Sequence, residues 1–174
     1  TDISNGFKAH NDSTIVAALS QELPLTYIST YKDFGDDLRI GHIDGSAVFS
    51  AIELPVNGAA VIGKATQSEN IPTAGTVGYT GDATHRTLGL GNSIEFGSSV
   101  FTADFVAKSV KGNLAFAKAG NIALSADIKG NQISGSAANN DGYATEGGFY
   151  GGDAQYLGGV YEGNGAQGTY GAKS

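Results

Sequence analysis

Two histidines of this chain each stand close to an arginine, and these four residues have the clearest potential for chemistry. Arg39 precedes His42 by three residues, and Arg86 directly follows His85; the chain contains no other arginine. Imidazole is the commonest metal ligand among side chains, and guanidinium pairs with carboxylates. Each pair could therefore hold a ligand that carries both a metal and acidic groups.

The residues around the two pairs would suit haem, which needs an imidazole for iron, apolar and aromatic walls, and cations for its propionates. Near His42 the aromatic and apolar residues are Tyr27, Tyr31, Phe34, Leu38, Ile40 and Ile43, and near His85 they are Tyr79, Leu88 and Leu90. Tyr27 and Tyr31 could serve as pocket walls, propionate donors or a tyrosinate ligand.

Plainer interpretations of the same residues stay open. Each histidine could be a solvated loop residue with an ordinary pKa, and both tyrosines could be core residues. His42 with Asp44, or His85 with Asp82, could hold zinc, but neither pair has the spacing of a known zinc motif. His10 is left out of the candidate set because it lies near the chain terminus.

Composition excludes several classes of function. The chain of 174 residues has no cysteine, methionine or tryptophan, so it has no disulfide, no thiolate metal site and no thiol nucleophile. The net charge is −7, and the ten basic residues are not clustered, which argues against nucleic acid. No G-x-S-x-G elbow or phosphate-binding loop occurs. We therefore expect a binding protein rather than an enzyme.

The first part of the chain, residues 1–73, must position His42. A capped apolar stripe predicts a short helix over about 13–22, and β-branched content predicts strands over 25–30, 46–54 and 59–65. The segment 31–45 is rich in turn formers and is expected to be a loop that carries Arg39 and His42. A polar stretch over 67–74 predicts the boundary between this ligand-binding region and a second domain, 74–174.

Residues 74–174 are expected to form an antiparallel β-barrel of eight strands. The first strand covers 76–84, and a loop over 85–92 carries His85 and Arg86. The next strand alternates, with Phe101, Ala103, Phe105 and Ala107 on one face and Val100, Thr102, Asp104 and Lys108 on the other. Later strands repeat this pattern up to three closing strands near 142–150, 154–162 and 166–173. One face is apolar and the other is charged, so the barrel is soluble with an apolar interior and does not span a membrane. The whole protein is predicted to be all-β.

The closing strands are unusual because paired glycines alternate with aromatic residues. Glycine weakens an isolated strand, so these glycines predict a tight bend, a bulge or crowding inside a narrow barrel. The segment Glu146–Gly151, the segment Asp153–Tyr161 and the ending Thr169–Lys173 resemble the closing hairpins of the transferrin-binding-protein-B-like β-barrel family. The resemblance covers about the last hundred residues and does not identify the ligand.

The resemblance implies a protein of the Gram-negative bacterial surface, and hemophilins, secreted haem-binding members, use histidines of the N-terminal region and adjoining loops. It therefore implies binding of haem b for iron acquisition, with His42 and His85 as iron ligands and Arg39, Arg86, Tyr31, Tyr27, Phe34 and Ile40 around the porphyrin. Because Thr1 follows no leader and no anchor cysteine, we expect a secreted protein, or one on the outer face of the outer membrane.

Other members bind host proteins, so the alternative is a module that binds a complement factor, transferrin or haemoglobin, or a colonisation factor. An outer-membrane export machine and a haem receptor are further partners that the resemblance implies.

Overall fold

The computed structural model describes residues 4–18, 21–49, 52–89 and 93–174, and it contains two separate β-structures. The first is an open antiparallel sheet in the order β1-β2-β3-β4, formed by Lys8–Ala18, Gln21–Phe34, Leu38–Phe49 and Ile52–Gly63. A linker with a short 3-10 turn, Ser68–Asn70, leads to the second. Among the described residues, no helix has the length and hydropathy to cross a bilayer.

The second structure is a closed barrel, as the sequence predicted. Its eight antiparallel strands follow one another as β10-β11-β12-β5-β6-β7-β8-β9. Their bounds are Thr76–Thr87 (β5), Glu95–Asp104 (β6), Ser109–Phe116 (β7), Gly120–Lys129 (β8), Gln132–Gly135 (β9), Ala144–Tyr150 (β10), Tyr156–Gly163 (β11) and Ala166–Lys173 (β12). Phe101, Ala103 and Phe105 are buried in the core, whereas Val100 is exposed, which confirms the predicted alternation as far as Phe105. The inward position predicted for Ala107 is wrong, because β6 ends at Asp104 and Ala107 is an exposed turn residue.

The N-terminal region differs from the prediction in two places. The predicted helix over 13–22 is wrong, because residues 13–18 belong to β1 and Pro24 lies within β2, paired with Ile15. Long antiparallel pairing and the β-branched residues Thr14 and Val16 outweigh the i, i+4 stripe. Residues 19–20 lie outside the described residues.

The predicted loop over 31–45 is also wrong, because only Gly35–Asp37 separate β2 from β3. The sequence predicts Gly41 and Gly45 as loop residues, but both lie in β3. They are glycines there because the neighbouring strand β2 leaves no room for a side chain. A Cβ on Gly41 would lie 2.5 Å from the carbonyl oxygen of Thr30. The predicted barrel loop over 85–92 is corrected in the same way, since His85 and Arg86 belong to β5; residues 90–92 lie outside the described residues.

Inside the barrel, two glycines make room for two tyrosines. Tyr170 lies opposite Gly159 and Tyr161 lies opposite Gly168 in the β11–β12 pair. A Cβ on either glycine would collide with the facing phenol ring. These rings are fully buried, and the Tyr170 hydroxyl is 2.7 Å from Thr145 Oγ1. The predicted crowding inside a narrow barrel therefore explains Gly159 and Gly168.

Two further glycines of the closing strands face outward, and the sheet packs on them. Gly158 and Gly171 lie opposite each other on the outside of β11 and β12. A Cβ on Gly158 would lie 2.9 Å from Leu38, and a Cβ on Gly171 would lie 2.6 Å from Phe34 and 3.1 Å from Ile40. Three side chains of the sheet thus pack directly against barrel backbone. We call this contact between the sheet and the barrel the seam.

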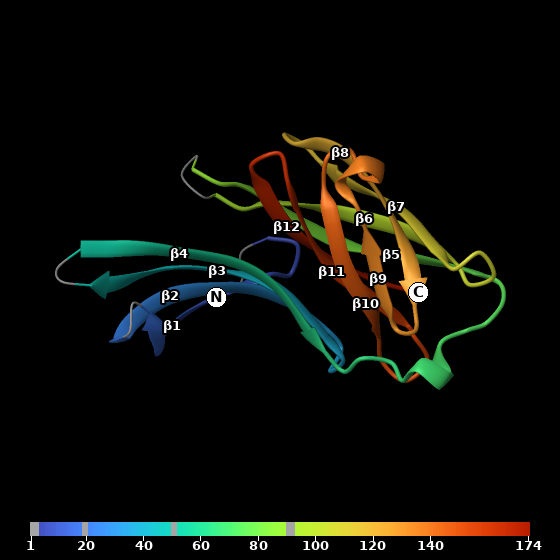
Figure 1. Ribbon diagram of the computed structural model, residues 1–174, viewed down its shortest axis with the longest axis horizontal. Coiled ribbons are helices and arrows are strands. Elements are labelled where there is room, and N and C mark those ends of the chain that lie inside the picture. Colours follow the sequence, from blue (N-terminus) through green and yellow to red (C-terminus); the bar gives the residue numbers. More distant parts are fainter. Residues whose placement is uncertain (1–3, 19–20, 50–51, 90–92) are drawn as a thin grey trace.

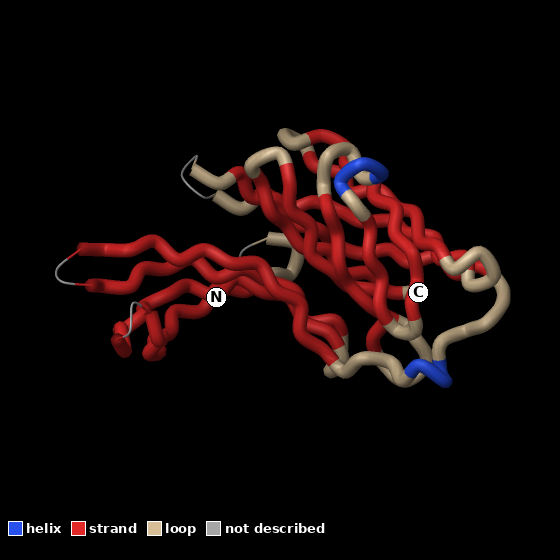
Figure 2. Tube along the Cα trace, in the orientation of Figure 1, coloured by secondary structure: helices blue, strands red, loops and turns tan. Residues whose placement is uncertain are grey.

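The seam covers only one part of the sheet. Figure 1 shows the four strands running on past the barrel, and Figure 2 shows that this extension is β-structure throughout its described length. The projecting part consists of the residues beyond the barrel contacts at Ile43 and Gly58, which are 11–28 and 44–57 as far as the structure describes them. The chain therefore presents a sheet surface at a fixed position beside one end of the barrel.

The seam gives a prediction for Gly171. Gly171→Ala should lower the free energy of unfolding by about 1–3 kcal/mol, because the new methyl group overlaps Phe34 and Ile40. Urea unfolding measures this, and Gly152→Ala is the control, since a Cβ there meets no atom within 4 Å. In a Gly171→Ala, Phe34→Leu double variant the two losses should be less than additive. Equal effects at Gly171 and Gly152 would contradict the seam.

Candidate functional site

His42 lies in the seam with its imidazole against the barrel wall. Its exposed fraction is 2%, and its Nε2 atom is 2.6 Å from Thr84 Oγ1, which in turn is 2.8 Å from Thr169 Oγ1. Burial, reinforced by the nearby Arg86 cation, lowers the pKa of His42 to about 3, although Gln167 opposes the shift. The imidazole is therefore neutral at any physiological pH.

Arg86 enters the same seam from the barrel side and is fully buried. Its Nη2 atom donates to the carbonyl oxygens of Ile43 and Gly58, at 3.1 and 3.2 Å, and to Gln167 at 2.8 Å. Its Nε and Nη1 atoms are buried without a partner, as is Nδ1 of His42. Burial lowers the pKa of the guanidinium, and Asp44 partly offsets the shift. This single side chain ties β5 to the backbones of β3 and β4.

His85 points the opposite way, into the barrel, because neighbouring residues of a strand face opposite sides. Its Nδ1 atom is 2.8 Å from the Tyr161 hydroxyl, and its ring packs against Tyr161, Phe116 and Tyr143 at centroid distances of 5.9, 5.4 and 6.3 Å. Burial lowers its pKa, against an opposing effect of Glu95. His85 is thus part of an aromatic cluster at the end of the barrel interior.

Arg39, Tyr31 and Tyr27 lie on the face of the sheet that points away from the barrel. Arg39 holds Asp33 with two bonds of 2.6 and 2.9 Å, and its guanidinium carbon is 4.1 Å from the centre of the Tyr31 ring. The Asp33 pair raises the pKa of Arg39 and lowers that of Asp33. The Tyr27 hydroxyl is 3.4 Å from Asp12. These residues cannot contact a ligand held in the seam.

The predicted site residues therefore occupy three separate places. His42, Arg86, Phe34 and Ile40 meet in the seam, His85 lies in the barrel, and the other three lie on the outer sheet face. Five surface hollows of about 490–710 Å³ are lined by other residues than His42 and His85. In this arrangement neither imidazole presents an open face to a porphyrin, so the predicted haem ligands do not fit haem as they stand. Haem ligation by His42 and His85 stays a prediction.

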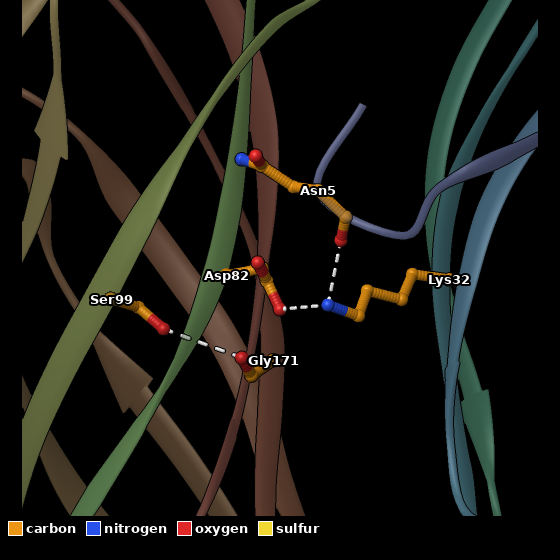
Figure 3. A network of polar contacts seen from close by, with 5 residues as sticks. All are labelled: Asn5, Lys32, Asp82, Ser99 and Gly171. Atoms are coloured by element: carbon orange, nitrogen blue, oxygen red, sulfur yellow. Dashed lines mark hydrogen bonds and ion pairs between the residues drawn. The ribbon is translucent and has the colours of Figure 1, made fainter. Parts of the chain in front are cut away.

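Sequence reasoning missed the polar and aromatic contacts that close the seam near the N-terminus. Figure 3 shows Lys32 reaching from β2 to the barrel, where its Nζ atom is 2.6 Å from Asp82 and donates to the carbonyl oxygen of Asn5 at 2.7 Å. Phe7 is fully buried and packs on Phe96 with ring centroids 4.8 Å apart. These partners are at least 27 residues apart in sequence, so no local motif marks them.

The projecting part of the sheet is the surface with the composition of a binding site. Ile28 is 47% exposed, and a shallow hollow of about 710 Å³ lies around it. The hollow is lined by Asn11, Asp12, Ser13, Thr26, Tyr27, Ile28, Asp44, Gly45 and Ser46. Among the described side chains of this part, Asp12, Glu22 and Asp44 are exposed and acidic, and none is lysine or arginine. Ile28 and Asp44 share one face of the sheet, whereas Tyr27 and Asp12 share the other. The projecting part is therefore acidic, with an exposed apolar side chain beside Asp44.

The sequence matches a known family over the whole barrel. The family model for the C-lobe and N-lobe β-barrels of Tf-binding protein B matches residues 71–174. An uncharacterised protein of Haemophilus influenzae (strain ATCC 51907 / DSM 11121 / KW20 / Rd) is 40% identical over 105 residues. That match covers 56% of this chain and 36% of the relative, so the alignment spans little more than a third of the relative's length.

Solved structures share the fold of both parts of the chain. Intact Ap-TbpB, with its N and C lobes, has a TM-score of 0.62 at 19% identity, and the match covers 94% of this chain and 38% of that protein. A transferrin-binding protein B mutant from Haemophilus parasuis Hp5 has a TM-score of 0.60 at 21% identity, covering 94% and 37%. A surface lipoprotein has a TM-score of 0.59 at 16% identity, covering 83% and 80%. The chain spans about two fifths of each of the first two proteins.

Burial of His42 predicts how stability depends on pH. The folded protein keeps His42 neutral down to about pH 3, whereas the unfolded chain takes up this proton near pH 6.5. Lowering the pH from 7 therefore favours the unfolded state, and stability falls by up to about 1.4 kcal/mol per pH unit from this group. In His42→Gln the fall should be smaller, as measured by urea unfolding at several pH values.

The matched control is His10→Gln, because His10 is exposed. It should reproduce the pH dependence of the unchanged protein, since carboxylates titrate alike in all three proteins. If His42→Gln has the same slope as the unchanged protein, the imidazole is not held neutral in the seam.

Proposed function

Because the chain belongs to the family of the C-lobe and N-lobe β-barrels of transferrin-binding protein B, we propose that it binds a host iron-carrying protein for bacterial iron acquisition. The family match over residues 71–174 is the observation that carries this proposal. The similar solved proteins are named as transferrin-binding proteins and as a surface lipoprotein, which supports a position at the bacterial surface.

The projecting part of the sheet is the binding surface in this proposal. Protein interfaces combine an apolar centre with polar surroundings, and Ile28 with its polar and acidic neighbours has that arrangement. Among the described side chains of this part, Asp12, Glu22 and Asp44 are exposed and none is lysine or arginine, which favours a cationic patch on the partner because opposite potentials accelerate association. Since the seam fixes this part of the sheet beside the barrel end, little order has to be gained on binding.

Haem remains a second candidate ligand, because one observation favours it. His42 Nδ1 and two nitrogens of Arg86 are buried without partners. An imidazole for iron and a cation for a propionate therefore lie side by side, although the packed seam must open before a porphyrin could reach them. In that case the haem would come from a host protein such as haemoglobin, and the export machine and haem receptor would be its bacterial partners.

The proposal predicts capture of an iron-carrying protein. The immobilised chain is exposed to iron-loaded transferrin, iron-free transferrin and haemoglobin, and binding is recorded by interferometry at several salt concentrations. We expect binding to at least one of them, weaker at high salt. Ile28→Ser and Asp44→Lys should each weaken it about tenfold or more, as expected for residues central to an interface.

Val100→Ser is the matched control, since Val100 is 54% exposed on the barrel and lies away from the projecting part. It should leave the affinity unchanged. Failure of all three host proteins to bind, together with an empty pull-down from serum, would contradict the proposed function. Equal losses at Val100 and Ile28 would retain the function but exclude this surface.

Hemin addition tests the second candidate separately. If haem is the ligand, hemin should produce a shifted Soret band, and His42→Ala should abolish the shift while His10→Ala retains it. An unchanged hemin spectrum in the presence of the protein would exclude haem and leave the host-protein proposal intact.

A further inference from the structure

Another of the hollows lies at the end of the barrel opposite to the projecting part of the sheet. Its volume is about 650 Å³, and its lining consists of Ser68, Ile71, Pro72, Thr73, Phe105, Lys108, Ile128, Lys129 and Gly130. It is formed where the linker passes the turns β6–β7 and β8–β9. In Figure 1 the linker, drawn in green, runs around this end of the barrel.

The linker that forms one wall is firmly attached to the barrel. Thr66 is 1% exposed; its hydroxyl donates to the carbonyl oxygen of Gly151 at 2.7 Å, and its backbone N–H donates to Phe149 at 2.9 Å. The Asn131 side chain donates to the carbonyl oxygen of Thr66 at 2.8 Å. Ile71 then packs against the barrel core. The hollow is therefore built from fixed elements on both sides.

The floor is apolar, and the only charges in the lining are positive. Ile71 and Pro72 supply most of the accessible apolar surface, since Phe105 and Ile128 also line the hollow but are only 2% and 7% exposed. Lys108 and Lys129 line the same hollow, and neither belongs to an ion pair recorded among the described residues. Lys108 has a left-handed backbone with φ of 54°, and its carbonyl oxygen accepts from Ile128 N–H at 2.9 Å. The turn backbone thus fixes the point from which the Lys108 side chain extends.

Three acids lie near this hollow in the chain, and none of them lines it; Asp127 precedes Lys129 by two residues on the same face of β8. The Asp104 carboxylate accepts from the backbone N–H groups of Val106 and Ala107, at 3.0 and 2.9 Å. Glu69 is exposed on the 3-10 turn and does not line the hollow. In a chain of net charge −7, a hollow lined by two lysines and no carboxylate is complementary to an anion.

We propose that this hollow binds a free amphiphile with one anionic head group and a single alkyl chain, of the fatty-acid class. The carboxylate lies between Lys108 and Lys129, and the chain covers Ile71, Pro72 and the accessible edges of Phe105 and Ile128. The volume is in the usual range for a small-ligand site, and an apolar wall with few charged groups is the usual lining. This site is independent of the proposed binding of a host protein.

Calorimetric titration with octanoate, decanoate and dodecanoate tests the proposal. Affinity should rise with chain length, by up to about fourfold for each added CH₂ that is buried. Decanol, which has the chain without the charge, should bind at least tenfold more weakly than decanoate. Amide shifts in NMR spectra should change at Ile71 and Ile128 and stay constant on β1–β4.

The variants separate a built site from general attraction of anions. Lys108→Asn with Lys129→Gln should weaken decanoate binding tenfold or more; asparagine is chosen because it tolerates the left-handed backbone. Lys111→Gln with Lys118→Gln removes the same charge elsewhere on the barrel and should leave the affinity unchanged. Thermal unfolding of both double variants shows that each is folded.

Three results would overturn the proposal. They are no heat and no amide shift with millimolar dodecanoate, equal weakening in both double variants, or affinity that does not depend on chain length. Co-sedimentation with phosphatidylglycerol vesicles, without binding of free dodecanoate, would also overturn it and identify this end as a membrane-facing surface instead.

Discussion

The arrangement of this molecule depends on the direct packing of side chains from the sheet against barrel backbone. Phe34, Leu38 and Ile40 reach the outside of β11 and β12 because Gly158 and Gly171 carry no Cβ there. Close contact between apolar side chains and backbone excludes water along the seam and supplies the dispersion contacts of a core. The barrel thereby acts as a rigid support for the sheet, whose far end projects beyond it (Figure 1).

Polar groups in the seam determine how the sheet is oriented on the barrel rather than how strongly it is attached. Arg86 donates to one carbonyl oxygen on β3 and to one on β4, and these two hydrogen bonds fix the position of both strands relative to β5. His42 and Thr84 make a second such contact. Burying a guanidinium and an imidazole costs free energy. The apolar contacts along the same seam offset this cost.

The barrel could be predicted from the sequence because its signals are local. Alternation in β6 and β8, and glycine-containing turns between short strands, fix each strand and its inner face. The open sheet could be predicted only in part. The strands predicted over 25–30 and 59–65 fall in β2 and largely in β4, whereas Gly41 and Gly45 resemble turn formers although pairing across β2 and β3 requires them in a strand. The outward glycines Gly158 and Gly171 could not be interpreted correctly without knowing that another sheet lies on them.

The histidine–arginine pairs show what residue type and spacing can predict about a site and what they cannot. The sequence marks Arg86 and His85 as unusual, and both are buried, but strand alternation sends them to opposite sides of β5. Had residues 85–87 been read as a continuation of the strand that begins at Thr76, Thr84 and Arg86 would have been expected on the outer face together. The contact of Lys32 with Asp82 joins residues 50 positions apart and had no such local signal.

Native-state hydrogen exchange of backbone amides tests the central claim, that the sheet and the barrel form one cooperative unit through the seam. The amides of β3 beside Ile40 should exchange with the same free energy as those of Leu114 in the barrel core, and Phe34→Ala should lower both. Exchange of β3 that is much faster than exchange of Leu114, and unchanged by Phe34→Ala, would show that the sheet is merely tethered.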